Sequence, residues 1–266
     1  MEQRYITTGD GCRIAYRLDG REGRPILMLS NSLGTTMEMW KPQLPAFAEN
    51  FRVLRYDSRG HGASDAPAGG YSMDRLGRDV VEILDGLGFD KVHFCGLSMG
   101  GMVGQWLGFR APERIDRLIL CNTSASMGPP SGWQSRIELV REQGMTAVAQ
   151  AVIERWFTPT YRARAPDEIA EVCDMLLRTD PLGYAGCCAA IRDMDMRPVL
   201  PLVRKAALVI AGLQDPATPP EHADIMMRLL PDASLVTLDA AHLSNIEQPA
   251  LFADAVLEFV MKSIVC

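Results

Sequence analysis

A serine between glycines is the strongest chemical signal in this sequence. Ser98 lies in the segment GLSMG (residues 96–100), which follows the strand-like run KVHFC and precedes the helical pattern MVGQWLGF. A sharp turn from strand to helix exposes a serine hydroxyl above the sheet, and small neighbours let the two elements approach closely. Because a G-x-S-x-G segment alone is also common in turns without chemistry, it is the strand, turn and helix context that favours Ser98 as a nucleophile.

A serine nucleophile needs a general base, and the four histidines of the chain are the candidates. His93 lies inside the strand-like run before Ser98 and is explained as a core residue. His61 belongs to the glycine-flanked turn RGHG, and His222 opens a helix after a proline pair. His242 instead follows the last strand-like run, at the carboxyl edge of the sheet where α/β folds collect their ligands. We predict His242 as the base.

Asp215 is the predicted acid that orients this base. It ends the segment AALVIAGLQD and lies between Ser98 and His242 in the chain, as required for this arrangement. Asp239 also follows a strand-like run, but it stands only three residues before His242 and is better explained as closing its loop. We expect Asp215 to hold the imidazole and to stabilise the imidazolium that forms during reaction.

Two backbone N–H groups are needed to stabilise the negative oxygen that develops when a serine attacks a carbonyl. One usually belongs to the residue after the nucleophile, and the other to the loop after the third strand. These positions are Met99 and Leu33, the latter in the loop SNSLGTT. The sequence therefore predicts an oxyanion hole built from backbone, where the side chains themselves matter little.

Short apolar runs alternate with longer amphipathic segments and predict the sheet that would position these residues. The two opening runs flank the turn GDG (residues 9–11) and predict an antiparallel hairpin. The six later runs predict parallel strands covered by helices, so we expect a mostly parallel, eight-stranded α/β sheet. Those six runs are residues 25–30, 51–57, 91–96, 117–122, 206–212 and 234–239.

Two helices on this sheet can be predicted with their ends. Residues 73–88 place their leucines, valine and isoleucine on one face, with Ser72 as N-cap and Gly88 as the stop. Residues 246–260 are expected to form a final helix.

The alternation of strands and helices stops between residues 124 and 197. This region opens with MGPPSG and continues with helix-like segments that contain Trp133 and Trp156, without a strand-like run. We predict a helical cap inserted at residues 124–197 into a core formed by residues 1–123 and 198–266.

Composition and charge exclude several classes of protein. The chain is 47% hydrophobic and 23% charged, and it has no apolar run of the roughly 18 residues that span a membrane. Its net charge of −6 disfavours nucleic acid as a partner. The N-terminus lacks the pattern of an export signal, and the seven cysteines form no C-x-x-C pair, so we expect a cytoplasmic protein with reduced thiols. No metal or cofactor motif is present, and we expect neither.

With these residues in place, the sequence resembles the α/β-hydrolase family over nearly its full length, and within it the 3-oxoadipate enol-lactonases of aromatic-compound degradation. Many members of the wider family carry His-Gly before the oxyanion residue, whereas this chain has Asn31-Ser32, as in the enol-lactonase variant. The resemblance rests on LSNSLGTTMEMWKPQLPAF, VLRYDSRGHGASDAPAGGYSMDRLGRDV, FCGLSMGGMVGQWLG, GLQDPATPP and DAAHLSNIEQP, in this order.

The resemblance implies hydrolysis of 3-oxoadipate enol-lactone to 3-oxoadipate, in the β-ketoadipate pathway of protocatechuate and catechol degradation. Ser98 would form an acyl-enzyme with His242 as base, and water would release the product. The substrate carries a carboxylate, so a basic group under the cap should meet it. We take Arg136 and Arg192 as candidates, with Trp133 as an apolar wall, although solvated helix faces and cap packing would also explain these residues.

Two alternatives remain open at the level of sequence. A general carboxylesterase or a cofactor-free haloperoxidase would share the same serine, acid and base and would differ in the cap. A binding protein of another class could keep the same three residues and use ligand capture to recruit a partner. The expected partners are a small lactone and water, and the sequence leaves assembly into homo-oligomers open.

Overall fold

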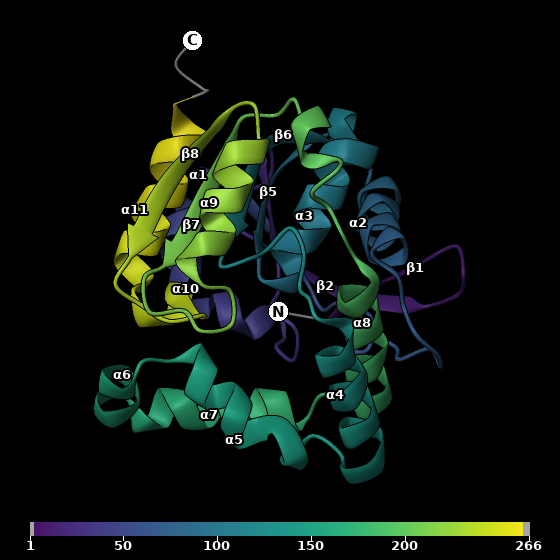
Figure 1. The fold of residues 1–266 in the computed structure, drawn as a ribbon. Helices are drawn as coiled ribbons and strands as arrows, with labels where there is room; N and C mark the ends of the chain where they lie inside the picture. Colours follow the sequence, from purple (N-terminus) through teal and green to yellow (C-terminus); the bar gives the residue numbers. More distant parts are fainter. Residues whose placement is uncertain (1–2, 263–266) are drawn as a thin grey trace.

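The computed structural model describes residues 3–262 and contains one eight-stranded sheet (Figure 1). The strand order is β1-β2-β4-β3-β5-β6-β7-β8, with antiparallel pairing only at β1–β2 and β2–β4. The predicted hairpin and the six predicted parallel strands are all confirmed. The strands are β1 Arg4–Thr7, β2 Arg13–Asp19, β3 Ile26–Ser30, β4 Arg52–Tyr56, β5 Val92–Leu97, β6 Ile115–Cys121, β7 Ala207–Gly212 and β8 Ala233–Leu238.

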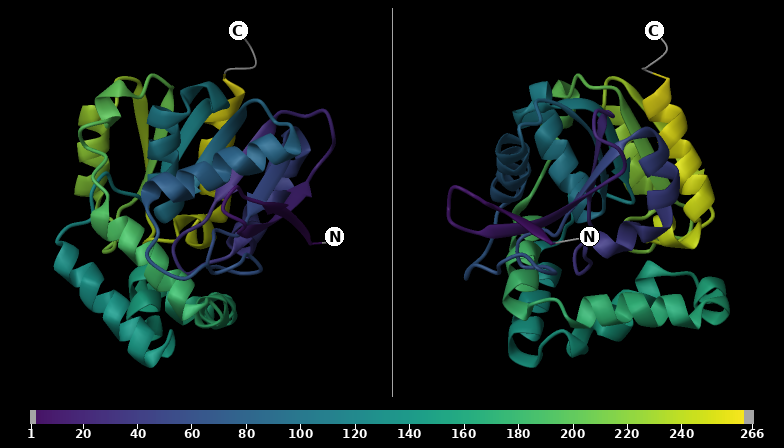
Figure 2. Two further views of the ribbon diagram at one scale, coloured as in Figure 1. Left: turned by 90° about the vertical axis from the view of Figure 1, so that its right-hand side faces the viewer. Right: turned by 180° about the vertical axis from the view of Figure 1, so that it is seen from behind.

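Helices cover both faces of the sheet and explain its apolar strands. The inner strands β5 and β7 are buried along their whole length, as is typical of parallel strands between two helical layers. Helices α2, α3 and α9 lie on one face, and α1 and α11 lie on the other (Figures 1 and 2). Their bounds are α1 Leu44–Asn50, α2 Met73–Leu87, α3 Met99–Arg110, α9 Pro220–Leu229 and α11 Pro249–Met261; the 3-10 turns are η1 Met37–Gln43, η2 Pro112–Arg114 and η3 Leu200–Leu202.

The ends of α2 are those that the sequence predicts. The Ser72 hydroxyl accepts a hydrogen bond from the Arg75 N–H, and Gly88 ends the helix in the left-handed conformation with φ 68°. The predicted final helix is only partly correct, because the chain forms α10 Ser244–Glu247, breaks at Gln248 and restarts as α11. Pro249 explains the break, since proline disfavours helical backbone in the residue before it.

Five helices lie between β6 and β7 in the chain: α4 Pro130–Gln143, α5 Thr146–Trp156, α6 Pro159–Arg164, α7 Pro166–Leu177 and α8 Pro181–Asp193. We call residues 130–193 the helical insertion. It lies across the side of the core toward which β7 and β8 point (Figures 1 and 2). Its two connections to the core run side by side. The Met196 N–H donates to the Ala125 carbonyl at 2.7 Å, and Ser126 and Asp195 pair in an isolated antiparallel β-bridge.

Two further observations concern the expected environment of the protein. Within residues 3–262, no helix has the length and apolar character needed to cross a membrane. The six cysteines in the same range are free thiols. The seventh, Cys266, lies outside the described residues.

Candidate active site

Ser98 lies on a strained turn between the end of β5 and the start of α3. Its φ of 57° and ψ of −115° are rare for a residue with a side chain, and its N–H is fixed by the Cys121 carbonyl at 2.8 Å. A β-carbon on Gly96 would lie 2.1 Å from the Gly100 carbonyl oxygen, and one on Gly100 would lie 2.2 Å from the Ser30 carbonyl oxygen. The two glycines therefore permit the close approach of strand and helix that raises the Ser98 hydroxyl above the sheet.

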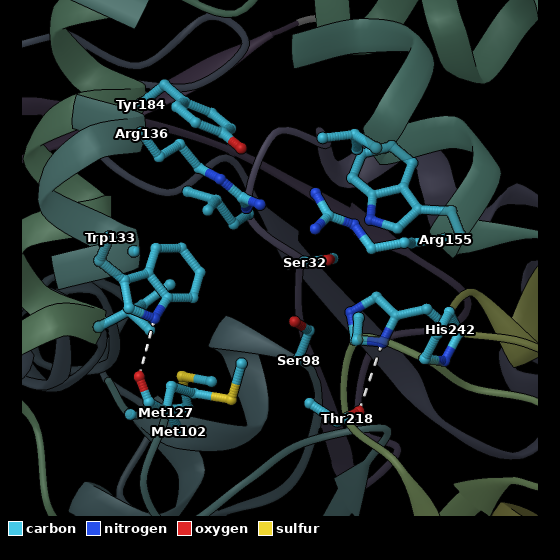
Figure 3. Close-up of a pocket in the computed structure, with 18 of the residues that line it drawn as sticks. Ser32, Ser98, Met102, Met127, Trp133, Arg136, Arg155, Tyr184, Thr218 and His242 are labelled. Atoms are coloured by element: carbon cyan, nitrogen blue, oxygen red, sulfur yellow. Dashed lines mark hydrogen bonds between the residues drawn. The ribbon is translucent and has the colours of Figure 1, made fainter. Parts of the chain in front are cut away.

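Asp215 and His242 come together at the carboxyl ends of β7 and β8. The Nδ1 atom of His242 lies 2.8 Å from Oδ2 of Asp215, and both side chains are buried. An ionised carboxylate only accepts hydrogen bonds, so Nδ1 donates and the lone pair stays on Nε2. In Figure 3 that free edge of the imidazole is turned toward the Ser98 hydroxyl. Asp239 is exposed and accepts a hydrogen bond from Gln214 instead.

Several donors converge on the Asp215 carboxylate. Its Oδ1 accepts from the N–H groups of Ala217 and Thr218, while its Oδ2 accepts from the Thr218 hydroxyl at 2.7 Å and the Asn122 amide at 3.0 Å. Burial alone would raise the pKa of Asp215, but the charge and hydrogen bond of His242, together with Thr218 and Asn122, lower it below its ordinary value. The acid is therefore ionised and held in one orientation.

Asn122 is a part of this site that sequence reasoning missed. It has a φ of 42°, and its amide donates both to Asp215 and to the Ala241 carbonyl at 3.2 Å. Its own oxygen accepts from the Ser244 hydroxyl at 2.6 Å. Asn122 thus links the end of β6 to both sides of the His242 loop, and its position as the last residue of a strand-like run was the available signal.

The two backbone donors predicted for the oxyanion hole are free. Within residues 3–262, the N–H groups of Leu33 and Met99 have no protein acceptor. Their neighbours are all engaged: the Ser32 N–H meets the Met39 sulfur, and the Gly100 N–H donates to the Asn31 carbonyl at 3.0 Å. Two unengaged donors on either side of Ser98 are what a developing oxyanion requires.

His61 shapes the loop that carries Leu33. Its Nε2 accepts the Gly34 N–H at 2.8 Å, and its Nδ1 lies 3.2 Å from the Arg59 carbonyl. The tautomer with a proton on Nδ1 satisfies both contacts. Burial lowers the pKa of His61 to about 4, so the ring is neutral at physiological pH. This geometry agrees with the prediction that His61 has a structural function.

A cavity of about 260 Å³ lies between Ser98 and the helical insertion (Figure 3). Its floor contains Ser98, His242 and the loop of Leu33, and its sides are mostly apolar. The larger apolar side chains that line it include Leu33, Met102, Met127, Trp133, Val152, Trp156 and Ile191. A site of this kind suits a small molecule with an apolar body and a few polar groups.

Two arginines give this cavity a positive end. Arg136 from α4 and Arg155 from α5 extend toward each other across it, beside the Tyr184 hydroxyl (Figure 3). Arg136 also stacks over the Trp133 ring at 5.0 Å. Burial, reinforced by the charge of Arg136, lowers the pKa of Arg155. Within residues 3–262, neither arginine has a carboxylate partner and no acidic residue lines the cavity.

The structure separates the three substrate contacts predicted from sequence. Trp133 and Arg136 line the cavity, but Arg192 does not; it pairs with Asp193 at 2.7 Å and donates to Gln134. Successive helical residues point about 100° apart, so Ile191 takes the cavity position and Arg192 turns away. Arg155 was missed, although it shares a helical face with Val152 and Trp156 in the sequence, and a cation on an apolar face was the available signal.

His93 and His222 do not line this cavity. The His93 ring packs edge-on against Phe51, and His222 lies outside the cavity near the start of α9. In the described part of the chain, no group of three or more His, Cys, Asp or Glu side chains could hold a metal ion.

Comparison with known proteins places this geometry in a family. Residues 25–164 match the model of the α/β hydrolase fold. The chain is 43% identical over 255 residues to 3-oxoadipate enol-lactonase 2 of Acinetobacter baylyi, which covers 96% of this chain and 95% of that protein. The crystal structure of the enol-lactonase from Burkholderia xenovorans superposes with a TM-score of 0.95 at 43% identity, covering 97% of this chain and all of that one.

A hydrolase from Pseudomonas aeruginosa has the same TM-score of 0.95 at 47% identity, covering 97% of this chain and 98% of that one. The fold, the match to the family model and the full-length similarity agree. The chain belongs to the α/β-hydrolase family, and within it is similar to the 3-oxoadipate enol-lactonases.

Proposed function

We propose that this protein hydrolyses 3-oxoadipate enol-lactone to 3-oxoadipate in the β-ketoadipate pathway, with Ser98, His242 and Asp215 as its catalytic triad. The observation that carries the proposal is a pair of arginines at the far end of the cavity above Ser98, which have no carboxylate partner within residues 3–262. They favour a small substrate that has an ester group at one end and a carboxylate at the other. The full-length relatives named as enol-lactonases support the same substrate.

Acylation begins when the Ser98 hydroxyl attacks the lactone carbonyl and its proton passes to Nε2 of His242. The carbonyl oxygen becomes negative and accepts from the N–H groups of Leu33 and Met99. Asp215 stabilises the imidazolium through the 2.8 Å contact with Nδ1. When the ring carbon–oxygen bond breaks, the leaving enol oxygen takes the proton from His242, and the opened chain stays attached to Ser98 as an ester.

Deacylation repeats these steps with water. His242 takes a proton from the water, the resulting hydroxide attacks the ester carbonyl, and the same two N–H groups hold the oxyanion. Collapse returns the proton to Ser98 and releases the acid. The enol becomes a ketone, which makes ring opening favourable, and the product then carries two carboxylates.

Arg136 and Arg155 are the groups we assign to the substrate carboxylate. A guanidinium binds a carboxylate through paired hydrogen bonds, and in a cavity with apolar walls such bonds are strengthened. Trp133 limits the same end of the cavity and holds Arg136 by stacking. A substrate carboxylate would also relieve the repulsion between the two arginines.

The proposal also covers the domain organisation, the cellular compartment and the partners of the protein. Residues 124–197 act as the cap, and residues 1–123 with 198–266 act as the catalytic core. We place the protein in the cytoplasm, with the lactone and water as its partners, no nucleic acid, and homo-oligomers left open. The free thiols among the described cysteines support this compartment.

The test is the loss of enol-lactone absorbance with purified protein, compared with hydrolysis of p-nitrophenyl acetate. We expect strong preference for the lactone in the wild type and no hydrolysis of either compound by Ser98→Ala. A general esterase would prefer the neutral ester. A binding protein would keep its biological effect in Ser98→Ala, and that result would refute catalysis.

The arginines provide a second arm of the test. Arg155→Met should lower kcat/KM for the lactone about ten- to hundredfold, because it removes hydrogen bonds to a charged group, and should change p-nitrophenyl acetate hydrolysis little. Arg192→Met is the matched control, since Arg192 lies outside the cavity and should leave both reactions unchanged. Equal effects of the two substitutions would contradict the assignment of the carboxylate site.

A further inference from the structure

The residues on both sides of His242 are tied to the helical insertion. The Leu243 N–H donates to the Trp156 carbonyl at the end of α5, at 3.0 Å. The Ala241 N–H donates to Oε2 of Glu247 at 3.1 Å, and Glu247 in turn contacts the insertion. The backbone that carries His242 is therefore held from both sides by contacts that involve the segment 156–158.

Glu247 is the centre of this connection. Its carboxylate is buried and accepts from the Thr158 hydroxyl, from the Thr158 N–H at 3.3 Å and from the Ala241 N–H. Within residues 3–262, no cationic side chain pairs with the Glu247 carboxylate. Arg164 is near, but it donates to the backbone carbonyl of Glu247. A buried carboxylate without a cation needs such donors to offset its loss of hydration.

The insertion supplies one more bond to the same helix. Thr158 is the N-cap of α6, and its hydroxyl also accepts the Tyr161 N–H at 3.1 Å. The Tyr161 hydroxyl donates to the Ile246 carbonyl of α10 at 3.3 Å. The start of α6 is thus hydrogen-bonded to Ile246 and Glu247, the last two residues of α10, next to His242.

We propose that Glu247 is a positioning residue that makes the helical insertion set the place of His242. The inference rests on the proposed function, because it concerns the base of that reaction. Glu247 does not line the cavity, so it would not touch a substrate bound there. It acts through the backbone of Ala241, so that the insertion, besides bounding the cavity, determines where the imidazole stands relative to Ser98.

Such a residue should influence turnover more than substrate binding. Proton transfer requires donor and acceptor within hydrogen-bond reach, and a misplacement of about 1 Å can slow a reaction about a hundredfold. Loss of the Glu247 contacts frees the backbone before His242 but leaves Arg136, Arg155 and the apolar walls in place. We therefore expect kcat to fall while KM is retained.

The variants that test this are Glu247→Met and Thr158→Val, with Thr158→Ser as the conservative rescue. Methionine has a similar length to Glu247 but offers the N–H groups of Ala241 and Thr158 no oxygen acceptor. Valine removes the hydroxyl of Thr158, whereas serine keeps it. Asp19→Asn is the matched stability control, because Asp19 is a buried carboxylate paired with Arg55 in a part of the sheet remote from His242.

We expect Glu247→Met and Thr158→Val to lower kcat about ten- to hundredfold with KM within about twofold. Labelling of Ser98 by a fluorophosphonate should slow by a similar factor. Thr158→Ser should stay within about threefold of wild type. Asp19→Asn should lower the Tm while keeping kcat.

The contrary results are equally definite. A folded Glu247→Met protein with wild-type kcat and labelling rate, a loss confined to KM, or an equal loss in Asp19→Asn would overturn the inference. All rates are also measured with p-nitrophenyl acetate. If the wild type hydrolyses this ester and not the enol-lactone, the proposed substrate is wrong, and the ratio of wild type to Glu247→Met on the ester still decides the role of Glu247.

Discussion

His61 illustrates how one residue can support the site without taking part in the reaction. Its ring is buried and accepts the Gly34 N–H in the loop that also carries Leu33. Protonation would replace the acceptor on Nε2 by a donor facing another donor. The neutral state of this imidazole is therefore part of the geometry of the proposed oxyanion hole.

Acid should destabilise the protein through His61. Burial lowers the pKa of His61 to about 4 in the folded chain, against 6.5 for an exposed histidine. Between these two values the unfolded chain binds a proton that the folded chain does not, so stability falls as pH drops from about 6.5 to about 4. By pH 5 the loss from this residue is on the order of 2 kcal/mol.

The measurement is urea unfolding of wild type and His61→Gln at pH 7.5 and pH 5. Glutamine can still accept the Gly34 N–H but does not titrate, so its loss of stability on acidification should be smaller by about 2 kcal/mol. Equal losses in the two proteins would show that His61 does not keep a depressed pKa.

At the scale of elements, the contact between α8 and the core depends on two glycines. A β-carbon on Gly183 would lie 2.3 Å from the Gly60 Cα, in the turn that also contains His61. The backbones meet directly, so no flexible side chain can move away. This contact fixes how closely α8, which carries Tyr184 into the cavity, approaches the core.

Gly183→Ala should therefore destabilise the protein by about 1–3 kcal/mol, as expected for overpacking. Gly132→Ala is a close control: both glycines are the third residue of a helix that begins with proline, but a β-carbon on Gly132 meets no atom within 4 Å. Alanine there should be neutral or stabilising by up to about 1 kcal/mol. Unfolding in urea measures both, and equal effects would contradict the importance of the Gly60–Gly183 contact.

The comparison with sequence-based prediction also belongs to this scale. The eight strands and α2 were predictable because each depends on local pattern: apolar runs, an N-cap at Ser72 and a stop at Gly88. The placement of Ser98, Asp215 and His242 at one edge of the sheet was predictable because Ser98 directly follows β5 and the other two lie in the loops that follow β7 and β8. Arg192 was misplaced and Arg155 missed because the direction of a side chain in the insertion depends on packing between helices. The role of Glu247 could not be predicted because it depends on a hydrogen bond with Thr158, which is 89 residues away in the sequence.

At the scale of the whole molecule, the cavity is formed by the core and the helical insertion together. The core supplies Ser98 and His242, and the insertion supplies Arg136 and Arg155. A dicarboxylate bound in the cavity would contact both parts and should therefore raise the free energy of unfolding of the entire chain. The protein has a net charge of −6, so this binding relies on the two arginines against the overall charge.

Adipate, a product-like dicarboxylate, provides the test in a thermal unfolding experiment. At 100 times its Kd it should stabilise the fold by about 2.7 kcal/mol and raise Tm by about 5 °C in one cooperative transition. Adipamide, which has the same length without charge, should raise it little. An equal shift with both compounds, or a transition split in two with adipate, would contradict a charge-selective site shared by core and insertion.

The paired connections at residues 125–126 and 195–196 have a practical consequence for engineering. Because the insertion leaves and re-enters the core at adjacent points, a foreign helical segment can be grafted there without disturbing the order of the strands. Such a chimera would combine a new binding cavity with the original Ser98 of the core. The graft must also reproduce the segment 156–158 or be combined with compensating changes at Glu247. Otherwise the chimera would bind the new substrate but hold the His242 imidazole in the wrong position relative to Ser98.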